Sequence, residues 1–130
     1  MKTHLLAALI TLFALCVAYA AETPEYRRLL IEREALLTDI IKELEVNKNF
    51  NELIQARLTL YSFRRDTANN VQTKIGQQQL IIQCLNDALS MVEKRQEAGL
   101  AGKLDILRAK DRILEAQVLL EQLKGSAAGQ

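Results

Sequence analysis

Apolar residues recur at three- and four-residue steps over most of the chain, which is the spacing of one face of an α-helix. The clearest case lies in residues 103–124, where six positions form a narrow seam: Ile106, Ala109, Ile113, Ala116, Leu120 and Leu123. Three more apolar residues, Leu107, Leu114 and Val118, widen this seam on one side. The pattern predicts a long amphipathic helix with spare apolar surface, which we expect to face a helical partner.

Turn residues separate this helix from the one before it. Gly99 is placed to end the preceding helix in a left-handed conformation, because a residue without Cβ adopts it without penalty. Gly102 then serves as N-cap, and Asp105 follows where a carboxylate complements the exposed amides and the helix dipole. We expect the last helix to end at Lys124, with residues 125–130 as a flexible tail.

A comparable turn is predicted in the first half of the chain. Thr23, followed by proline and glutamate, is a helix start signal, and residues 29–44 carry a wide apolar face. Asn47 can end that helix in a left-handed conformation. Asn49, with Glu52 three residues later, forms a capping-box pattern that begins the next helix.

These two turns predict an internal two-fold repeat of a helical hairpin. A shift of 52 residues places Asn47 on Gly99, and a shift of 53 places Asn49 on Gly102. The alternative is chance similarity, since any two amphipathic helices share some apolar positions. The predicted repeats span about 23–73 and 74–124.

The segment between the hairpins, residues 64–79, is polar but contains no proline. An unbroken four-three spacing runs through it and beyond, at Val71, Ile75, Gln78, Ile82, Leu85, Leu89 and Val92. Because this segment lacks clear turn chemistry, we expect one helix from about 51 to 98, roughly 70 Å long, in an elongated three-helix molecule. A break at Asn69-Asn70 or at Gly76 gives a four-helix bundle instead. In both cases the predicted fold class is all-α, with antiparallel helical hairpins or a coiled coil.

Residues 1–20 have the pattern of a secretory signal peptide. Lys2 provides the positive start, an apolar run follows, and Ala18-Tyr19-Ala20 is an A-x-A cleavage site. An uncleaved anchor is the alternative, but the run is shorter than the roughly 20 apolar residues of a spanning helix. We expect no membrane-spanning segment after cleavage, and a single helical domain over residues 21–126.

Cleavage changes the chemistry that the chain offers. Loss of Lys2 lowers the Lys and Arg count from 17 to 16, equal to the 16 acidic residues, so no net basic charge favours nucleic acid. Loss of His4 removes the only histidine, the usual general base and metal ligand. Asp105, Asp111 and Glu115 alternate with basic residues, as in a solvated ion-pair face. We therefore expect no enzyme, and no catalytic, cofactor-binding or metal-binding residue.

Cys84 is the only cysteine left after cleavage. It can form an intermolecular disulfide, or it can pack as a small apolar residue beside Leu80, Ala88 and Met91, which we favour. The glutamines at 77–79 can hydrogen-bond across a helix interface or set its register.

The run E-A-G-x-x-G-x-L-D-I-L-R-A-K-x-x-I-L-E-A-Q at residues 97–117 resembles the internal repeat of TolC-type outer-membrane efflux proteins, in which a helix ends at Gly and the next begins with an Asp-Val-Leu-x-Ala-like run. The resemblance is looser over residues 45–60 and covers the helical hairpin only, since no stretch has the period-two pattern of a β-strand. It implies a periplasmic hairpin near the outer membrane of a Gram-negative cell.

Two functions are compatible with this sequence. The first is a structural or interaction protein of the cell envelope, which pairs with itself or with another helical envelope protein. The second is an accessory subunit or remnant of an outer-membrane efflux system. The partner, any transported substrate and the oligomeric state stay open at this point.

Overall fold

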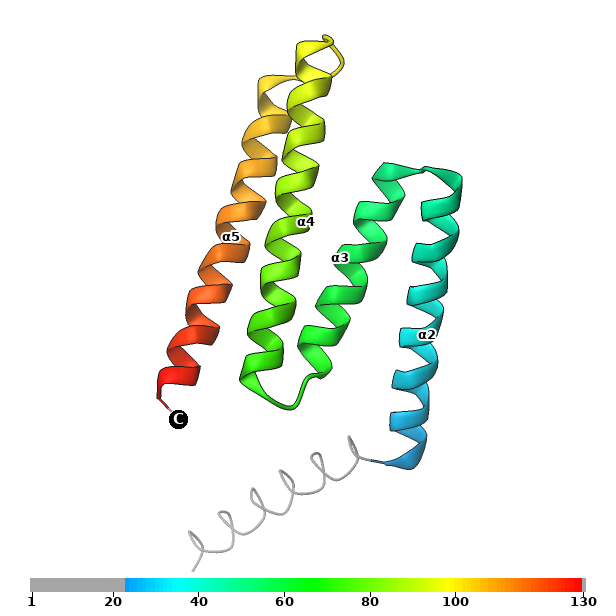
Figure 1. The fold of residues 1–130 in the computed structure, drawn as a ribbon. Coiled ribbons are helices and arrows are strands. Elements are labelled where there is room, and N and C mark those ends of the chain that lie inside the picture. The colour runs from blue at the N-terminus through cyan, green and yellow to red at the C-terminus, as the bar shows by residue number, and fades with distance from the viewer. Residues whose placement is uncertain (1–22, 130) are drawn as a thin grey trace, which may run out of the picture. The chain divides into compact units, whose positions relative to one another are not determined.

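A computed structural model describes residues 23–129, which form four α-helices (Figure 1). They are α2 (Pro24–Asn47), α3 (Phe50–Thr67), α4 (Val71–Glu97) and α5 (Lys103–Ala128). No strand occurs among the described residues, so the predicted all-α class is confirmed. The predicted signal peptide, residues 1–20, lies outside the described range.

By its contacts the chain divides into two units, and the boundary after Leu36 falls within α2. The described part of the first unit begins at the predicted start signal, where the hydroxyl of Thr23 accepts a hydrogen bond from the amide of Tyr26 at 3.2 Å. Arg28 then pairs with Glu25 at 2.7 Å and with Glu32 at 3.0 Å. Because these side chains are exposed, the pairs contribute little to stability.

The second unit contains the rest of α2 together with α3, α4 and α5. In this unit α4 lies between α3 and α5 and runs antiparallel to both (Figure 1). The core where these three helices meet consists of Leu58, Ile81, Cys84, Leu85, Ile113 and Ala116. The seam predicted for α5 is the face that supplies its part of this core: Ile113 and Ala116 are buried, and the other four seam residues are half-buried.

The expected continuous middle helix is wrong, because the chain breaks between Thr67 and Val71. Ala68 is extended, with φ −67° and ψ 137°, and the side chain of Asn70 caps α4 by accepting a hydrogen bond from the amide of Thr73 at 2.8 Å. Such side-chain bonds offer the backbone an alternative to helix. Reversal at this point lets α3 pack on α4, which a straight helix cannot do. Residues 23–129 therefore form four helices, where the continuous middle helix would give three.

At its carboxyl end α5 continues through Gly125 to Ala128, beyond the predicted end at Lys124. The amide of Gly129 bonds to the carbonyl of Gly125 at 3.3 Å and closes the last turn. Residues 125–128, expected as part of a flexible tail, are thus helical.

Candidate functional site

The turn between α2 and α3 is a compact helix-ending motif. The amide of Asn49 donates to the carbonyl of Leu44 at 3.3 Å, and Lys48 has a positive φ of 54°. This is the Schellman arrangement, in which a left-handed residue follows the helix. The left-handed position falls at Lys48 and not at Asn47 as predicted, because Asn47 is still the last helical residue.

Asn49 also begins the next helix. Its side-chain oxygen accepts a hydrogen bond from the amide of Glu52 at 3.3 Å, which satisfies one of the amides left open at the start of α3. Arg57 of α3 then pairs with Glu45 in the last turns of α2 at 2.8 Å. The caps and this ion pair fix how the chain enters α3.

The turn between α4 and α5 contains the same helix-ending motif. Gly99 has a φ of +74°, its amide donates to the carbonyl of Gln96 at 2.9 Å, and the amide of Leu100 donates to the carbonyl of Arg95 at 2.7 Å. The carboxylate of Asp105 then accepts a hydrogen bond from the amide of Gly102 at 2.8 Å. Since glycine has no side chain, this is one half of a capping box.

The two turns share a mechanism but not a length. Asn49, the N-cap of α3, follows the left-handed Lys48 directly, whereas two residues separate Gly99 from Gly102. The halves of the capping interaction also differ: the side chain of Asn49 accepts in the first turn, and the side chain of Asp105 accepts in the second. The internal repeat stays a prediction. The similarity of these two turns supports it at these positions.

A second apolar stripe runs along α5, away from the helix face that packs on α4. The three predicted partner residues Leu107, Leu114 and Val118 are 51%, 61% and 59% exposed. Leu104, which the sequence analysis did not select, is 57% exposed and extends the same stripe. The one polar member is Asp111, which is also exposed. We call these five residues the outer stripe.

The outer stripe and the packed seam lie on nearly opposite sides of α5. Each outer-stripe residue lies two positions before a seam residue, as Leu104 does before Ile106 and Leu114 before Ala116. Because successive helical residues rotate by roughly 100°, a two-residue offset points side chains almost in opposite directions. The helix is therefore apolar on two faces, of which only one is covered in the described chain.

The buried polar side chain of Gln78 ties the three core helices together. It is 1% exposed, its amide nitrogen donates to the carbonyl of Ala116 at 2.8 Å, and its oxygen accepts from the guanidinium of Arg65 at 2.8 Å. A buried amide is stable only when it is bonded in this way. The position of Gln78 within the apolar series of α4 is the sequence signal for such a bond.

Cys84 is a free cysteine, and its side chain is buried in the core with 5% of its surface exposed. It packs there as a small apolar residue. Burial raises the pKa of the Cys84 thiol, while the nearby Arg57 guanidinium acts in the opposite direction. A neutral, enclosed thiol is poorly suited to disulfide exchange, which proceeds through an exposed thiolate.

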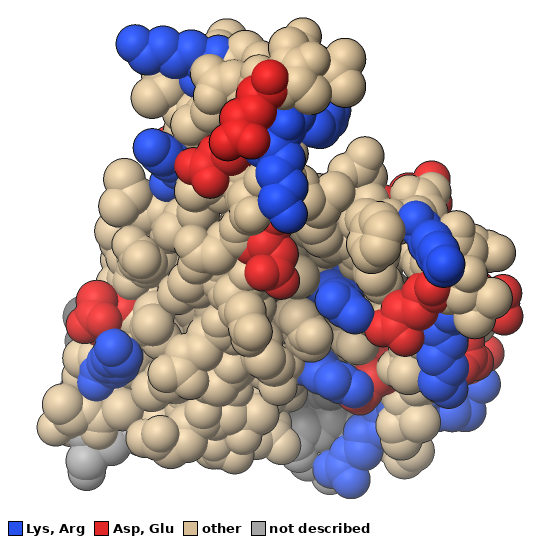
Figure 2. Space-filling view, turned by 45° about the horizontal axis from the view of Figure 1, so that its top comes forward, with Lys and Arg blue, Asp and Glu red and all other residues tan. Residues whose placement is uncertain are grey.

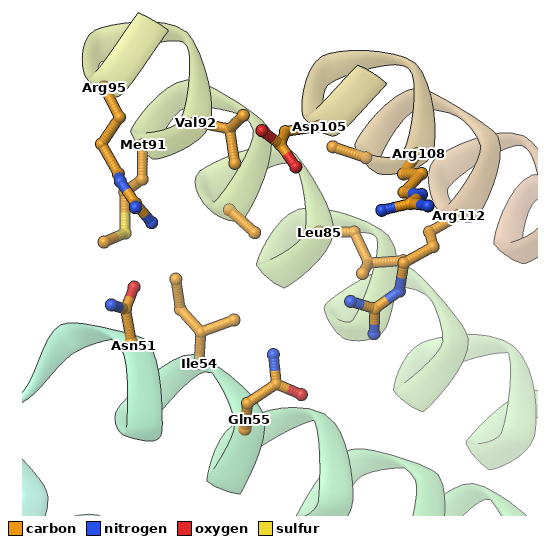
Figure 3. Close-up of a pocket in the computed structure, with 12 residues that line it drawn as sticks. Asn51, Ile54, Gln55, Leu85, Met91, Val92, Arg95, Asp105, Arg108 and Arg112 are labelled. Atoms are coloured by element: carbon orange, nitrogen blue, oxygen red, sulfur yellow. The ribbon is translucent and has the colours of Figure 1, made fainter. Parts of the chain in front are cut away.

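A hollow of about 330 Å³ lies where the beginnings of α3 and α5 face the second half of α4 (Figure 3). In this view Asn51, Ile54 and Gln55 point into the hollow from α3, and Arg108 and Arg112 border it on α5. The only carboxylate among its lining residues is Asp105, which is already occupied as a cap. The lining offers no paired acid and base, and we assign no reaction to it.

We find no metal-binding cluster or membrane-spanning helix among the described residues, and no charged patch on the face viewed in Figure 2. On the face in Figure 2 basic and acidic side chains lie interspersed and do not form a field of one sign. Residues 23–129 contain no cluster of three potential metal ligands. Over the same residues, no helix combines the length and the apolar character that crossing a membrane requires.

In comparisons with known proteins, no family model, no curated protein and no solved structure matches this chain.

Proposed function

We propose that this protein is a non-enzymatic helical interaction protein of the periplasm, and that α5 binds a helical partner there. The observation that carries the proposal is the outer stripe, in which four apolar side chains stay more than half exposed. Exposed apolar residues that form a stripe at helical spacing favour burial against another helix.

The location of this binding in the periplasm rests on two features of the sequence. Residues 1–20 have the pattern of a signal peptide, and residues 97–117 resemble the hairpin repeat of TolC-type proteins. The tight turn at Gly99 and Gly102 supports the second feature, because a hairpin of that kind needs a helix-ending glycine followed by an acidic first turn.

The test is fractionation of the full chain expressed in a Gram-negative host. We expect the protein to be cut after Ala20, as shown by the mass of the mature chain, and to appear in the periplasmic fraction. The matched control replaces Ala18 and Ala20 by Phe, which blocks the A-x-A site. An uncut wild-type chain that remains in the cytoplasm contradicts the proposal.

An accessory role in an outer-membrane efflux system is the second candidate, supported by the same glycine turn and its TolC-like sequence. It predicts that the mature protein fractionates with the outer membrane in a large complex, and that deletion lowers efflux of small molecules. A periplasmic protein without such a complex favours the first candidate.

A further inference from the structure

We propose that the helical partner of α5 is a second copy of this chain, and that two α5 helices pair antiparallel through their outer stripes. This proposal rests on the proposed function and deepens it by naming the partner. The stripe has the alternating three- and four-residue steps with which two helices interlock side chains.

Asp111 within the stripe, together with the charges beside it, favours an antiparallel direction of pairing. With helices antiparallel, Leu107 packs against Val118 of the second copy, and Asp111 against Leu114 of the second copy. Arg108 then lies beside Glu115 of the second copy, and the two-fold symmetry repeats this pair. Two Arg108–Glu115 ion pairs thus lie along one edge of the apolar contact.

Parallel pairing is less favourable on the same grounds. In register, it places the two copies of Asp111 directly against each other in the seam. It also brings Lys103 of one copy beside Arg108 of the other, and only Lys110 and Glu115 attract. Each arrangement contains one kind of attracting pair and one kind of repelling pair along its edges, but the antiparallel arrangement avoids the contact between the two Asp111 carboxylates.

Arg108 and Glu115 are available for this contact. Both are exposed, and neither forms an ion pair with another described residue. The opposite edge of the stripe holds Lys110 and Gln117, which meet each other in the antiparallel pair, and at the ends of this edge Lys103 meets Lys124 of the second copy as a like charge. Within the described chain, the pairing therefore needs no rearrangement of existing ion pairs.

Asp111 is the one unfavourable member of the stripe. A carboxylate facing Leu114 of the second copy loses hydration, which weakens association. The same residue opposes registers that bring two such carboxylates together, as a polar residue in a helical seam often does. Asp111→Leu should consequently strengthen the dimer, at least tenfold in affinity, an effect that a folding defect cannot imitate.

The experiment measures the mass of the mature full chain by sedimentation over a wide concentration range, under reducing conditions. We expect a monomer–dimer equilibrium in the wild type, and weaker association by at least tenfold for Arg108→Glu and for Glu115→Arg. The double variant Arg108→Glu with Glu115→Arg should regain the wild-type affinity. Circular dichroism of each variant verifies that helicity is retained.

The matched control is Lys110→Glu on the other edge of α5. Antiparallel pairing predicts little change, because residue 110 meets neutral Gln117, whereas parallel pairing predicts a loss of affinity. A wild-type monomer at all concentrations, a dimer unaffected by these charge changes and by Asp111→Leu, or a double variant that stays monomeric each overturns the proposal.

The failure of this inference is distinguishable from failure of the proposed function. A processed periplasmic protein that is monomeric contradicts self-pairing and leaves the envelope function in place. An unprocessed cytoplasmic protein that dimerises as described contradicts the periplasmic function and leaves the α5 interface in place.

Discussion

At the scale of single residues, the two helix-ending turns fill the same left-handed position with different side chains. Lys48 and Gly99 both have positive φ, but only Gly99 is free of a Cβ. We predict that Gly99→Val lowers the free energy of unfolding by about 1–2 kcal/mol, the usual strain of a left-handed residue. A Cβ at Gly99 meets nothing within 4 Å, so the effect is conformational and not a clash. Chemical denaturation followed by circular dichroism measures it.

Gly99→Asn is the matched control, since asparagine tolerates the left-handed region better than valine does. We expect this variant to lose clearly less stability than Gly99→Val. Equal stability of the wild type and the valine variant in denaturant would show that the turn is not built on a left-handed residue at 99.

The buried thiol of Cys84 gives a prediction about pH. Because burial raises its pKa, the folded state keeps the proton to higher pH than the unfolded state does. The free energy of unfolding should therefore fall as pH rises above the ordinary thiol value of about 9.0. Cys84→Ala should reduce this slope when unfolding is measured in denaturant at several alkaline pH values. Identical slopes in both proteins would show that the thiol is not buried in solution.

At the scale of elements, the side chain of Gln78 on α4 links the three core helices through hydrogen bonds to α3 and α5. We predict that Gln78→Met, which keeps the volume but removes both hydrogen bonds, lowers the free energy of unfolding by about 1–3 kcal/mol. The adjacent Gln79 is exposed, and Gln79→Met should change stability by no more than about 0.5 kcal/mol. Urea denaturation compares the two variants. Equal effects at both positions would indicate that the amide of Gln78 does not link the helices.

At the scale of the whole molecule, stability should be unevenly distributed along the chain. Helix α4 is flanked by α3 and α5 and holds four buried residues, whereas no residue of α2 is buried. Amide hydrogen exchange of dilute protein should therefore be slowest in the middle of α4 and fastest in α2. Equal protection of α2 and α4 would mean that the apolar face of α2 is covered in solution.

Much of the secondary structure can be predicted from the sequence because its determinants are local. The cap at Thr23, the restart of the chain at Asn49 and the glycine at position 99 act through neighbouring amides and carbonyls. The three-four spacing likewise identifies the seam of α5 without knowledge of its partner. The exact end of a helix is less certain, as Lys48 and Gly125 show, because packing and backbone bonds select among several acceptable endings.

The order of apolar and turn-forming residues is therefore enough to predict an all-helical fold, two glycine- or asparagine-based turns and an apolar seam on the last helix. Three features become visible only when the helices are packed together: the chain reverses at Ala68, Gln78 is buried, and the outer stripe of α5 is exposed. The physical reason is that periodicity records which side chains favour burial. Which of them are covered depends on contacts between residues far apart in the chain.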